Sequence, residues 1–546
     1  MAGDEDEDYL IKGIKSGFHI IDSERDIPSV KVENHKSALQ NKAAVTEIIM
    51  DEIDKERYII VCDHQAACGC WKPNIISPLG LIPKSNGKYR LIHDCSLPHG
   101  KAVNDITLEM DKQSYESVDT AVDLMEVGCY MAKVDITAAY RAVAIHPSSY
   151  AAAGLCWKIN GVDTVLIDKR LMFGARPSPN CFHRISQFIK RRMIHRGYDR
   201  IVAYQDDFLV IGSTIEQCQE AWETLMCLIR ELGFNVNMDK VVAPTQVITF
   251  LGIELNSILM EISLPIDKLV KYRQYIRQFL GKTRASKRQL QSLAGKLNHT
   301  AKVVKGGRIF LRRILNSINK LRHGHHKCKV QGELKKDIEW WGAFIKDFNG
   351  VATSMDRNDC VTVVTDACLD AGGAFYNGDF YYVNWKVDYP ALADLPINYK
   401  EAGMAALCIA RWAHLWRNKM VYLYSDNMCT VSIINKCSCK DKNVMELLRT
   451  NFWLLASHNV VVKAMYLPGR LNHIADTVSR LHEGLGNLLQ LESIINEWHF
   501  NHRYVDDAFK YVSLVNHMSI GALSELQDHE KWRIRRWPWM RSFSHL

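Results

Sequence analysis

The chain has 546 residues, of which 47% are apolar and 9% aromatic, and its net charge is +8. This composition excludes wholesale disorder, and the length favours roughly three to five domains. An acidic start (MAGDEDEDYL), 16 scattered cysteines and the lack of any apolar run of about 18 residues predict no signal peptide, no membrane span and a reducing cytoplasmic or nuclear location.

Residues 1–70 are charged and weakly patterned, which predicts a partly ordered N-terminal leader. Its last part, CDHQAACGC, offers four zinc-capable side chains whose spacing differs from the paired cysteines of zinc fingers. A zinc site is one alternative for this stretch, with the ligands Cys62, His64, Cys68 and Cys70. Packed structure is expected to begin near residue 74, because NIISPLGLIPKSNGKYRLIHDCS (74–96) has two apolar stretches flanking the Asn-Gly turn of a hairpin.

Two adjacent aspartates, Asp206 and Asp207, lie between apolar runs in AYQDDFLVIG (203–212). Adjacent carboxylates repel each other and lose solvation beside buried strands, so we expect a hairpin tip where a divalent cation offsets the repulsion. Asp135 is the expected partner, because CYMAKVDITAAYRAVAI (129–145) predicts a strand that ends at this aspartate and runs into a helix-like turn. Two magnesium ions held by such carboxylates activate an attacking 3′-hydroxyl and stabilise a leaving pyrophosphate. The alternative is a chance surface turn.

A helix that Gly233 stops and a strand pair over 247–256 are predicted next. The following segment, Lys268–Lys336, holds 20 Lys or Arg and one acid, a net charge of +19, at helical spacing. Phosphate binding and a solvated helical face are both open for such a segment. HGHHKC (323–328) within it is expected to be a solvated or phosphate-facing loop rather than a metal site.

Strand and turn patterns return over 360–385, followed by an amphipathic helix over 400–416 and a buried strand over 421–427. Four acids occur along this part in the order strand, helix, strand, helix. Each alone would be an ordinary surface charge, whereas together they are what a two-metal nuclease needs to gather its ions. These acids are Asp366, Glu401, Asp426 and Asp476.

Six segments resemble, in order and spacing, the successive motifs of a reverse transcriptase over roughly residues 75–260; they are LGLIPKSNGKYRLIHD, KVDITAAYRAV, LMFGARPSPNCF, YQDDFLV, LGFNVNMDK and FLGIEL. The resemblance implies that Asp135, Asp206 and Asp207 are the polymerase carboxylates. It also implies that the carbonyl of Ile136 is a further metal ligand and that FLGIEL, around Gly252, is the primer-grip turn.

The same resemblance implies a site for the incoming nucleotide. Lys84 and Arg90 match fingers positions that hold the triphosphate, which suits a mobile cationic hairpin. Tyr140 matches the bulky position that excludes a 2′-hydroxyl by steric clash. Phe173-Gly174 matches the motif that packs against the nascent base pair; retroviral enzymes usually have Gln at the first position, whereas many retrotransposons have Phe. The alternative for Tyr140 is an ordinary core tyrosine.

The acid quartet, with Ser425–Asn427 and Asn472, resembles ribonuclease H over about residues 360–482. There is one departure from the pattern. Many ribonucleases H have a histidine in a loop about ten residues before the last aspartate, where this chain reads AMYLPGR. The nearby His473 is not assigned this role, which leaves product release or proton handling in doubt.

The predicted fold class is α+β: a polymerase right hand of fingers, palm and thumb/connection, followed by a ribonuclease H-like α/β domain. The expected boundaries are 71–265 for fingers and palm, 266–350 for the basic thumb and connection, 355–482 for the ribonuclease H-like domain and 483–546 for a C-terminal tail of unknown role.

The predicted function is RNA-directed and DNA-directed DNA synthesis combined with ribonuclease H activity. Two Mg²⁺ ions are expected at each site, with Mn²⁺ as the alternative ion. The expected partners are an RNA template, a DNA primer, an RNA–DNA hybrid and deoxynucleoside triphosphates. The wording of the motifs is most similar to DIRS-type retrotransposons, with gypsy-type elements as runner-up, and a recombinase or integrase is expected to come from another polypeptide. Two other interpretations stay open: a catalytically silent nucleic-acid-binding derivative, and an RNA-copying RNA polymerase, which the acid quartet and Tyr140 disfavour.

Overall fold

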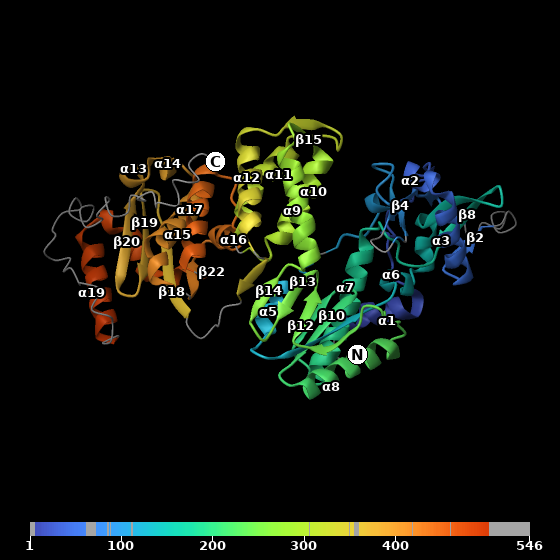
Figure 1. Cartoon of the computed structure of the whole chain (residues 1–546), viewed down its shortest axis with the longest axis horizontal. Helices are drawn as coiled ribbons and strands as arrows, with labels where there is room; N and C mark the ends of the chain where they lie inside the picture. Colours follow the sequence, from blue (N-terminus) through green and yellow to red (C-terminus); the bar gives the residue numbers. More distant parts are fainter. Residues whose placement is uncertain are drawn as a thin grey trace. The chain divides into compact units, whose positions relative to one another are not determined.

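The chain forms two compact units, Met1–Leu259 and Met260–Leu546 (Figure 1). The structure is a computed structural model that describes residues 6–61, 72–83, 87, 89–110, 113–304, 306–348, 350–353, 360–417, 419–458 and 460–501. Lys84 and the candidate zinc ligands between Cys62 and Cys70 lie outside the described residues. None of the helices within the described ranges has the length and apolar character needed to cross a bilayer.

Within the stretch expected to be a partly ordered leader, residues 6–60 contribute helices and strands that pack into the first unit. Helix α1 (Glu7–Ser16) buries Leu10, and Phe18 beyond its end is 2% exposed in the same core. Asp6, which precedes α1, forms ion pairs with Arg184 and Arg191, two residues of the helix Pro177–His195.

The outer part of the first unit is a five-stranded sheet with the order β1-β3-β7-β8-β2, beside a two-stranded hairpin of β4 and β5. Helix α3 contributes buried Val45 and Ile49 to the core beneath them. The bounds of these elements are β1 (Val30–Lys31), α2 (Lys36–Gln40), α3 (Lys42–Asp54), β2 (Tyr58–Ile60), β3 (Ile75–Ile76), β4 (Leu79–Pro83), β5 (Tyr89–His93), β7 (Gly154–Ile159) and β8 (Val162–Asp168).

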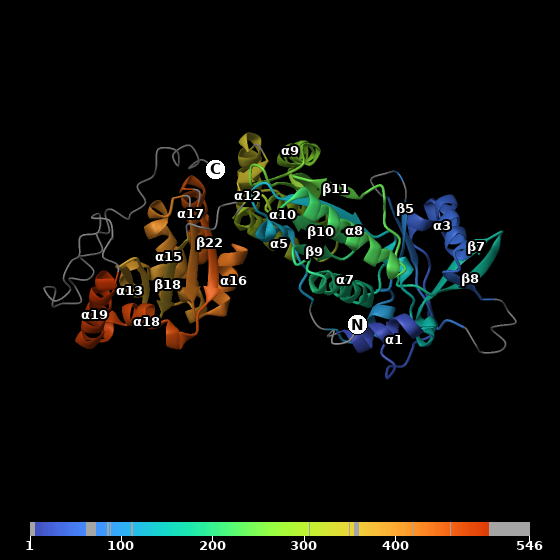
Figure 2. The same cartoon turned by 90° about the horizontal axis from the view of Figure 1, so that it is seen from below.

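The inner part of the first unit is a four-stranded sheet with the order β11-β6-β10-β9. Helices α7 and α8 pack against each other and against this sheet (Figure 2). Phe208 and Val210 of the central strand are at most 1% exposed, and they form the core with Phe182 of α7. The bounds are α5 (Val118–Leu124), β6 (Tyr130–Asp135), α6 (Ala139–Ala142), α7 (Pro177–His195), β9 (Ile201–Tyr204), β10 (Asp207–Gly212), α8 (Ile215–Glu231) and β11 (Val242–Thr245).

A tight hairpin ends the first unit: β12 (Val247–Phe250) pairs antiparallel with β13 (Ile253–Asn256). Its two turn residues, Leu251 and Gly252, both have positive φ values of 47° and 80°. Two left-handed residues match the twist of the flanking strands, so the glycine is suited to the second position. The predicted strand pair is therefore confirmed.

The second unit begins with helices that carry the basic segment. Along α9, Leu269 and Ile276 are buried while Lys271 and Arg277 are exposed, so these two charges lie on the outer face. The bounds are β14 (Glu261–Ser263), α9 (Ile266–Leu280), β15 (Arg284–Ser286), α10 (Lys287–Thr300), α11 (Arg312–Asn319), β16 (Lys327–Lys329), α12 (Gly332–Asp347) and β17 (Val351–Thr353).

The rest of the second unit is a five-stranded sheet with the order β20-β19-β18-β21-β22, in which β18, β21 and β22 run parallel. Helix α15 packs on β18, and α17 packs on α15 (Figure 1). The bounds are β18 (Cys360–Ala367), β19 (Ala371–Tyr376), β20 (Asp379–Asn384), α13 (Trp385–Asp388), α14 (Pro390–Ala393), α15 (Ile397–Trp412), β21 (Met420–Ser425), α16 (Met428–Lys436), α17 (Lys442–His458), β22 (Val461–Tyr466), α18 (His473–Ser479) and α19 (Leu485–Asn501). The sequence predictions for 360–385, 400–416 and 421–427 are confirmed in type.

An aromatic cluster connects α12 and α17 within the second unit. Phe310 stacks on Trp340 with ring centroids 3.5 Å apart, and the Phe452 ring of α17 meets both edge-on. Beside the cluster, Asp337 of α12 is fully buried and forms ion pairs with Arg313 at 3.1 Å and Arg449 at 3.9 Å. The basic helices and the five-stranded sheet therefore belong to one packed body.

Candidate functional sites

The three candidate polymerase aspartates meet at one end of the β6–β10 pair. Asp207 is the first residue of β10 and lies opposite Asp135, the last residue of β6. Asp206 lies in the two-residue turn before β10, and its carbonyl accepts a hydrogen bond of 2.9 Å from the backbone N–H of Ile136. The other turn residue, Gln205, has a left-handed φ of 54°. The strand pairing thus brings together residues that are about 70 positions apart in the sequence.

The electrostatics of this cluster disfavour three carboxylates that are all ionised. Burial, followed by the charges of Asp206 and Asp135, raises the pKa of Asp207 to about 6. Burial also raises the pKa of Asp206, while Lys240 and Arg90 act in the opposite direction. A divalent cation would remove the penalty that these shifts express.

Two side chains that the sequence analysis did not assign hold Asp135 in place. Lys240 Nζ lies 2.9 Å from Asp135 Oδ2, and Asn237 Nδ2 donates to Oδ1 at 3.0 Å. The Asp135 side chain is 2% exposed, and its hydrogen bond raises the pKa of Lys240. Both residues lie in the quoted segment LGFNVNMDK, so a lysine shortly after a helix stop was the available signal.

The candidate nucleotide-binding residues form a continuous surface next to the aspartates. The rings of Tyr140 and Phe173 lie 5.2 Å apart, and the Arg90 guanidinium carbon lies 5.0 Å from the Phe173 ring centroid. The Tyr140 hydroxyl donates to Gln205 Oε1 at 3.4 Å, which connects this surface to the aspartate turn. Glycine is required at 174, because φ is 125° and a Cβ would lie 1.9 Å from the carbonyl oxygen of His93.

The second cluster lies at one end of the five-stranded sheet. Asp366 is near the end of β18, Asp426 follows β21, and Glu401 projects from α15. One ligand atom from each of the three lies within 4.8 Å of the others, and no other such trio of His, Cys, Asp or Glu occurs in the described part of the chain. The parallel pairing of β18 with β21 brings the two aspartates to the same edge.

The environment of Glu401 indicates that this cluster suits a cation. Its side chain is 4% exposed, and Oε2 is buried without a hydrogen-bond partner. Burial, with the charges of Asp366 and Asp426, raises the pKa of Glu401 to about 9. An unpaired buried oxygen beside two further carboxylates is the donor set that Mg²⁺ prefers.

Asp476 is not part of that trio. Its Oδ1 is 2.7 Å from Nε of Arg480, one turn later on the chain, and the carboxylate side chain is 47% exposed. Ser479, at the end of the same helix, donates a hydrogen bond of 2.7 Å to Asp366 Oδ2. Asn472, just before the helix, donates one of 3.0 Å to the carbonyl of Thr365. The sequence analysis missed Ser479 and Arg480, although both follow Asp476 at helical spacing.

The loop that lacks the expected histidine contains Gly469. A Cβ at this glycine would lie 3.0 Å from Asp426 Oδ2, so the backbone passes close to the carboxylate. His473 lies beyond the loop, exposed at the start of α18.

Comparison with known proteins gives a family match for the first unit. Residues 82–255 match the family described as reverse transcriptase (RNA-dependent DNA polymerase). A curated but uncharacterised protein of Caenorhabditis elegans is 25% identical over 143 residues, which are 26% of this chain and 11% of that relative's length.

Two solved structures have a similar fold. The foamy viral protease-reverse transcriptase in complex with an RNA/DNA hybrid has a TM-score of 0.51 at 16% identity, covering 82% of this chain and 56% of that chain. The foamy viral protease-reverse transcriptase dRH in complex with double-stranded DNA has a TM-score of 0.50 at 16% identity, covering 82% of this chain and 73% of that chain. This likeness confirms the predicted fold class in its coarser form, a mixed α and β polymerase fold.

Proposed function

We propose that the chain is an RNA-directed DNA polymerase of a retroelement with a second, ribonuclease H site. The observation that carries the polymerase assignment is the pairing of Asp207 opposite Asp135, with Asp206 in the adjoining turn, inside the region that matches the reverse transcriptase family. In this proposal fingers and palm occupy 71–265, thumb and connection 266–350 and the nuclease domain 355–482.

At the polymerase site, Asp135, Asp206 and Asp207 would hold two Mg²⁺ ions, with the Ile136 carbonyl as a further ligand. When bound, the ions supply Lewis-acid activation of a primer hydroxyl and neutralise the triphosphate. Lys240 neutralises Asp135 when no ion is present, because its ammonium group lies 2.9 Å from the carboxylate. Asn237 fixes the orientation of the same carboxylate through Oδ1.

The nucleotide-facing residues have separate tasks in this proposal. Arg90 lies close enough to lower the pKa of Asp206, so its charge also reaches the expected position of the phosphates. The Tyr140 ring occupies the space that a 2′-hydroxyl would need, and Phe173 packs beside it. Lys84 is proposed as a second triphosphate ligand from the sequence resemblance alone.

At the nuclease site, Asp366, Glu401 and Asp426 would hold the ions, and Asp476 would complete the set from the edge of the cluster. The raised pKa of Glu401 means that ions must displace its proton, since the carboxylic acid is a poor ligand. Ser479 keeps one oxygen of Asp366 hydrogen-bonded and therefore fixes the direction of the other.

The proposed partners are an RNA template, a DNA primer, an RNA–DNA hybrid and deoxynucleoside triphosphates. Supporting this, Lys271 and Arg277 of α9 are exposed, so phosphates can approach them. The motif wording favours a DIRS-type element over a gypsy-type one, and a recombinase or integrase would come from another polypeptide.

The test is primer extension on an RNA template with magnesium and deoxynucleotides, with the RNA strand end-labelled. Extension together with shortening of the RNA supports both sites. Extension without shortening removes the nuclease assignment. Tight binding of the duplex with neither product supports instead a catalytically silent derivative.

A further inference from the structure

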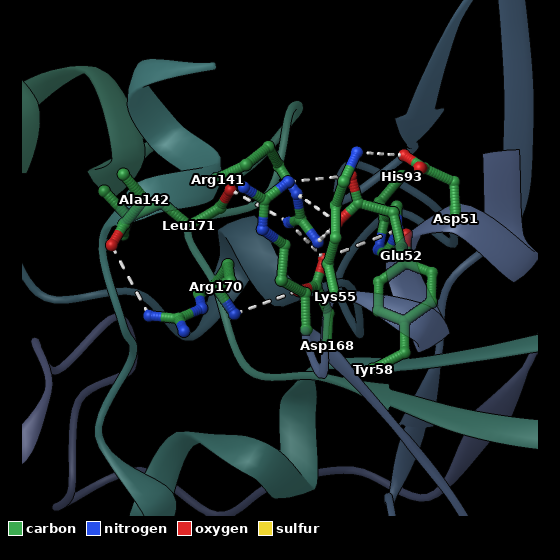
Figure 3. Close-up of polar contacts among 11 residues, drawn as sticks. Asp51, Glu52, Lys55, Tyr58, His93, Arg141, Ala142, Asp168, Arg170 and Leu171 are labelled. Carbon is green, nitrogen blue, oxygen red and sulfur yellow. Dashed lines mark hydrogen bonds and ion pairs between the residues drawn. The ribbon is translucent and has the colours of Figure 1, made fainter. Parts of the chain in front are cut away.

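Figure 3 shows a buried ion network with Arg141 at its centre. Its Nη1 lies 2.7 Å from Asp168 Oδ2, and its Nη2 lies 2.8 Å from Glu52 Oε2. Nε also donates to Glu52 at 3.1 Å, and Nη1 reaches the carbonyl of Leu171 at 3.3 Å. One guanidinium group therefore connects α3, the end of β8 and the loop that follows it.

The network is closed off from solvent. The side chains of Arg141, Asp168 and Glu52 are 8%, 0% and 12% exposed. Arg57 lies 3.3 Å from the second oxygen of Glu52, so two arginines balance two carboxylates. The planar guanidinium holds five donors in a rigid fork, whereas a lysine ammonium is a compact point charge with three, so a lysine cannot reproduce this geometry.

The network continues to the fingers hairpin through a buried histidine. Nε2 of His93, the last residue of β5, lies 3.7 Å from Asp168 Oδ2 and 3.2 Å from the Tyr58 hydroxyl. Burial lowers the pKa of His93 to about 4, so the ring is neutral at physiological pH. The His93 backbone N–H donates to the carbonyl of Phe173 at 3.1 Å.

Tyr140, Phe173 and Arg90 are each connected to the network through the backbone. Tyr140 directly precedes Arg141, Phe173 follows Leu171 by two positions, and Arg90 shares β5 with His93. The two rings that meet at 5.2 Å come from segments whose backbones Arg141 ties together. A shift of the guanidinium would therefore change the separation of the rings.

We propose that Arg141 is a positioning residue that sets the Tyr140–Phe173 separation and thereby the selection of deoxynucleotides over ribonucleotides. This inference rests on the proposed polymerase function. Arg141 does not contact the nucleotide, because it is enclosed by Glu52, Asp168 and Leu171. It acts by holding Tyr140 at the place where the ring obstructs a 2′-hydroxyl.

The experiment measures kcat/KM for a deoxynucleotide and for the matching ribonucleotide on one primed RNA template, and takes their ratio. The ratio is independent of the fraction of active protein, so partial misfolding alone does not change it. The first variant is Arg141→Lys, which keeps the positive charge but loses the planar set of guanidinium donors. The second is Glu52→Gln, which keeps one acceptor oxygen and removes the negative charge, and should therefore disturb the network less. The full-length chain is used throughout.

The expected result is a fall of at least about tenfold in the ratio for Arg141→Lys, because displacements near 1 Å change rates by about 100-fold. Glu52→Gln should give a smaller fall in the same direction. The matched control is Asp337→Asn, which breaks a buried arginine–carboxylate pair in the second unit and should lower the unfolding temperature without changing the ratio.

A ratio within about twofold of the wild type for both variants, in folded protein, would overturn the proposal. If Arg141→Lys does not fold, the ratio measured for Glu52→Gln decides the question, since this variant leaves the ion pair between Arg141 and Asp168 intact. A wild-type chain that extends no primer would instead overturn the polymerase function, and the inference with it.

Discussion

Asp207 lies directly opposite Asp135 in the antiparallel pairing of β10 with β6. Residues opposite each other in a sheet project to the same face, so the two carboxylates share one side of the strand pair. With Asp206 in the turn, the fold concentrates three negative charges at one edge, and this concentration is unfavourable without a counter-ion.

Separate substitutions should separate the two proposed activities. Asp206→Asn removes one metal ligand and should lower DNA synthesis by more than about 100-fold, since even loss of an outer-shell partner costs about 10–100-fold. It should leave hybrid cleavage unchanged, because the nuclease acids lie on another sheet. Asp426→Asn should do the reverse. Both are measured in the end-labelled primer-extension assay, and loss of both activities from either single change would contradict a two-site enzyme.

Tyr140 should control the choice of sugar. Tyr140→Val removes the ring and should lower the preference for deoxynucleotides by about 10–200-fold, the range that steric differences of this size provide. The control is Tyr140→Phe, which keeps the ring and loses only the hydroxyl contact with Gln205. Single-nucleotide incorporation measures both, and an equal loss of selectivity in the two variants would show that the hydroxyl, not the ring, is responsible.

Glu401 should make the stability of the metal-free chain depend on pH. Its pKa is about 9 in the folded state against an ordinary 4.5, so the folded chain binds more protons between these values. Stability should therefore fall as pH rises through this window. Added magnesium should raise the unfolding temperature more at pH 8 than at pH 6, by several degrees, given about 2–4 °C per kcal/mol for a unit of this size.

Thermal scans of Glu401→Gln provide the comparison for that measurement. The amide has no proton to lose and is a weaker ligand, so both the pH slope and the magnesium effect should diminish. An unchanged pH slope would assign the dependence to another group.

Substitution of Ser479 should change the rate of hybrid cleavage and leave DNA synthesis unchanged. Its hydroxyl lowers the pKa of Asp366, which burial raises, so Ser479→Ala should favour the protonated carboxyl and lower hybrid cleavage by about 10–100-fold near neutral pH. Ser479→Thr keeps the hydroxyl and should retain most of the cleavage. Activity that rises again with pH in the alanine variant would support the electrostatic explanation, whereas a pH-independent loss would point to disturbed packing.

Short motifs predict where the candidate acids lie relative to the strands. Asp135 ends an apolar strand, and Asp206 and Asp207 lie between two others, so local pattern alone predicts that they share one end of a sheet. The β12–β13 hairpin around Gly252 was predictable for the same reason.

The Arg141 network was not predictable in this way. Its partners Glu52 and Asp168 are 89 and 27 residues away in the sequence, and no local pattern specifies which carboxylates will meet an arginine.

The stacked rings of Phe310 and Trp340, met edge-on by Phe452, bear on how the protein can be dissected. A chain shortened just after α12 would retain Trp340, which is 8% exposed in the intact protein, and lose the helix that covers it. The uncovered rings would form an exposed hydrophobic patch, and such a fragment should self-associate. A polymerase defect in that fragment would then report aggregation rather than any catalytic need for the nuclease, so point substitutions are the sounder way to silence one activity at a time.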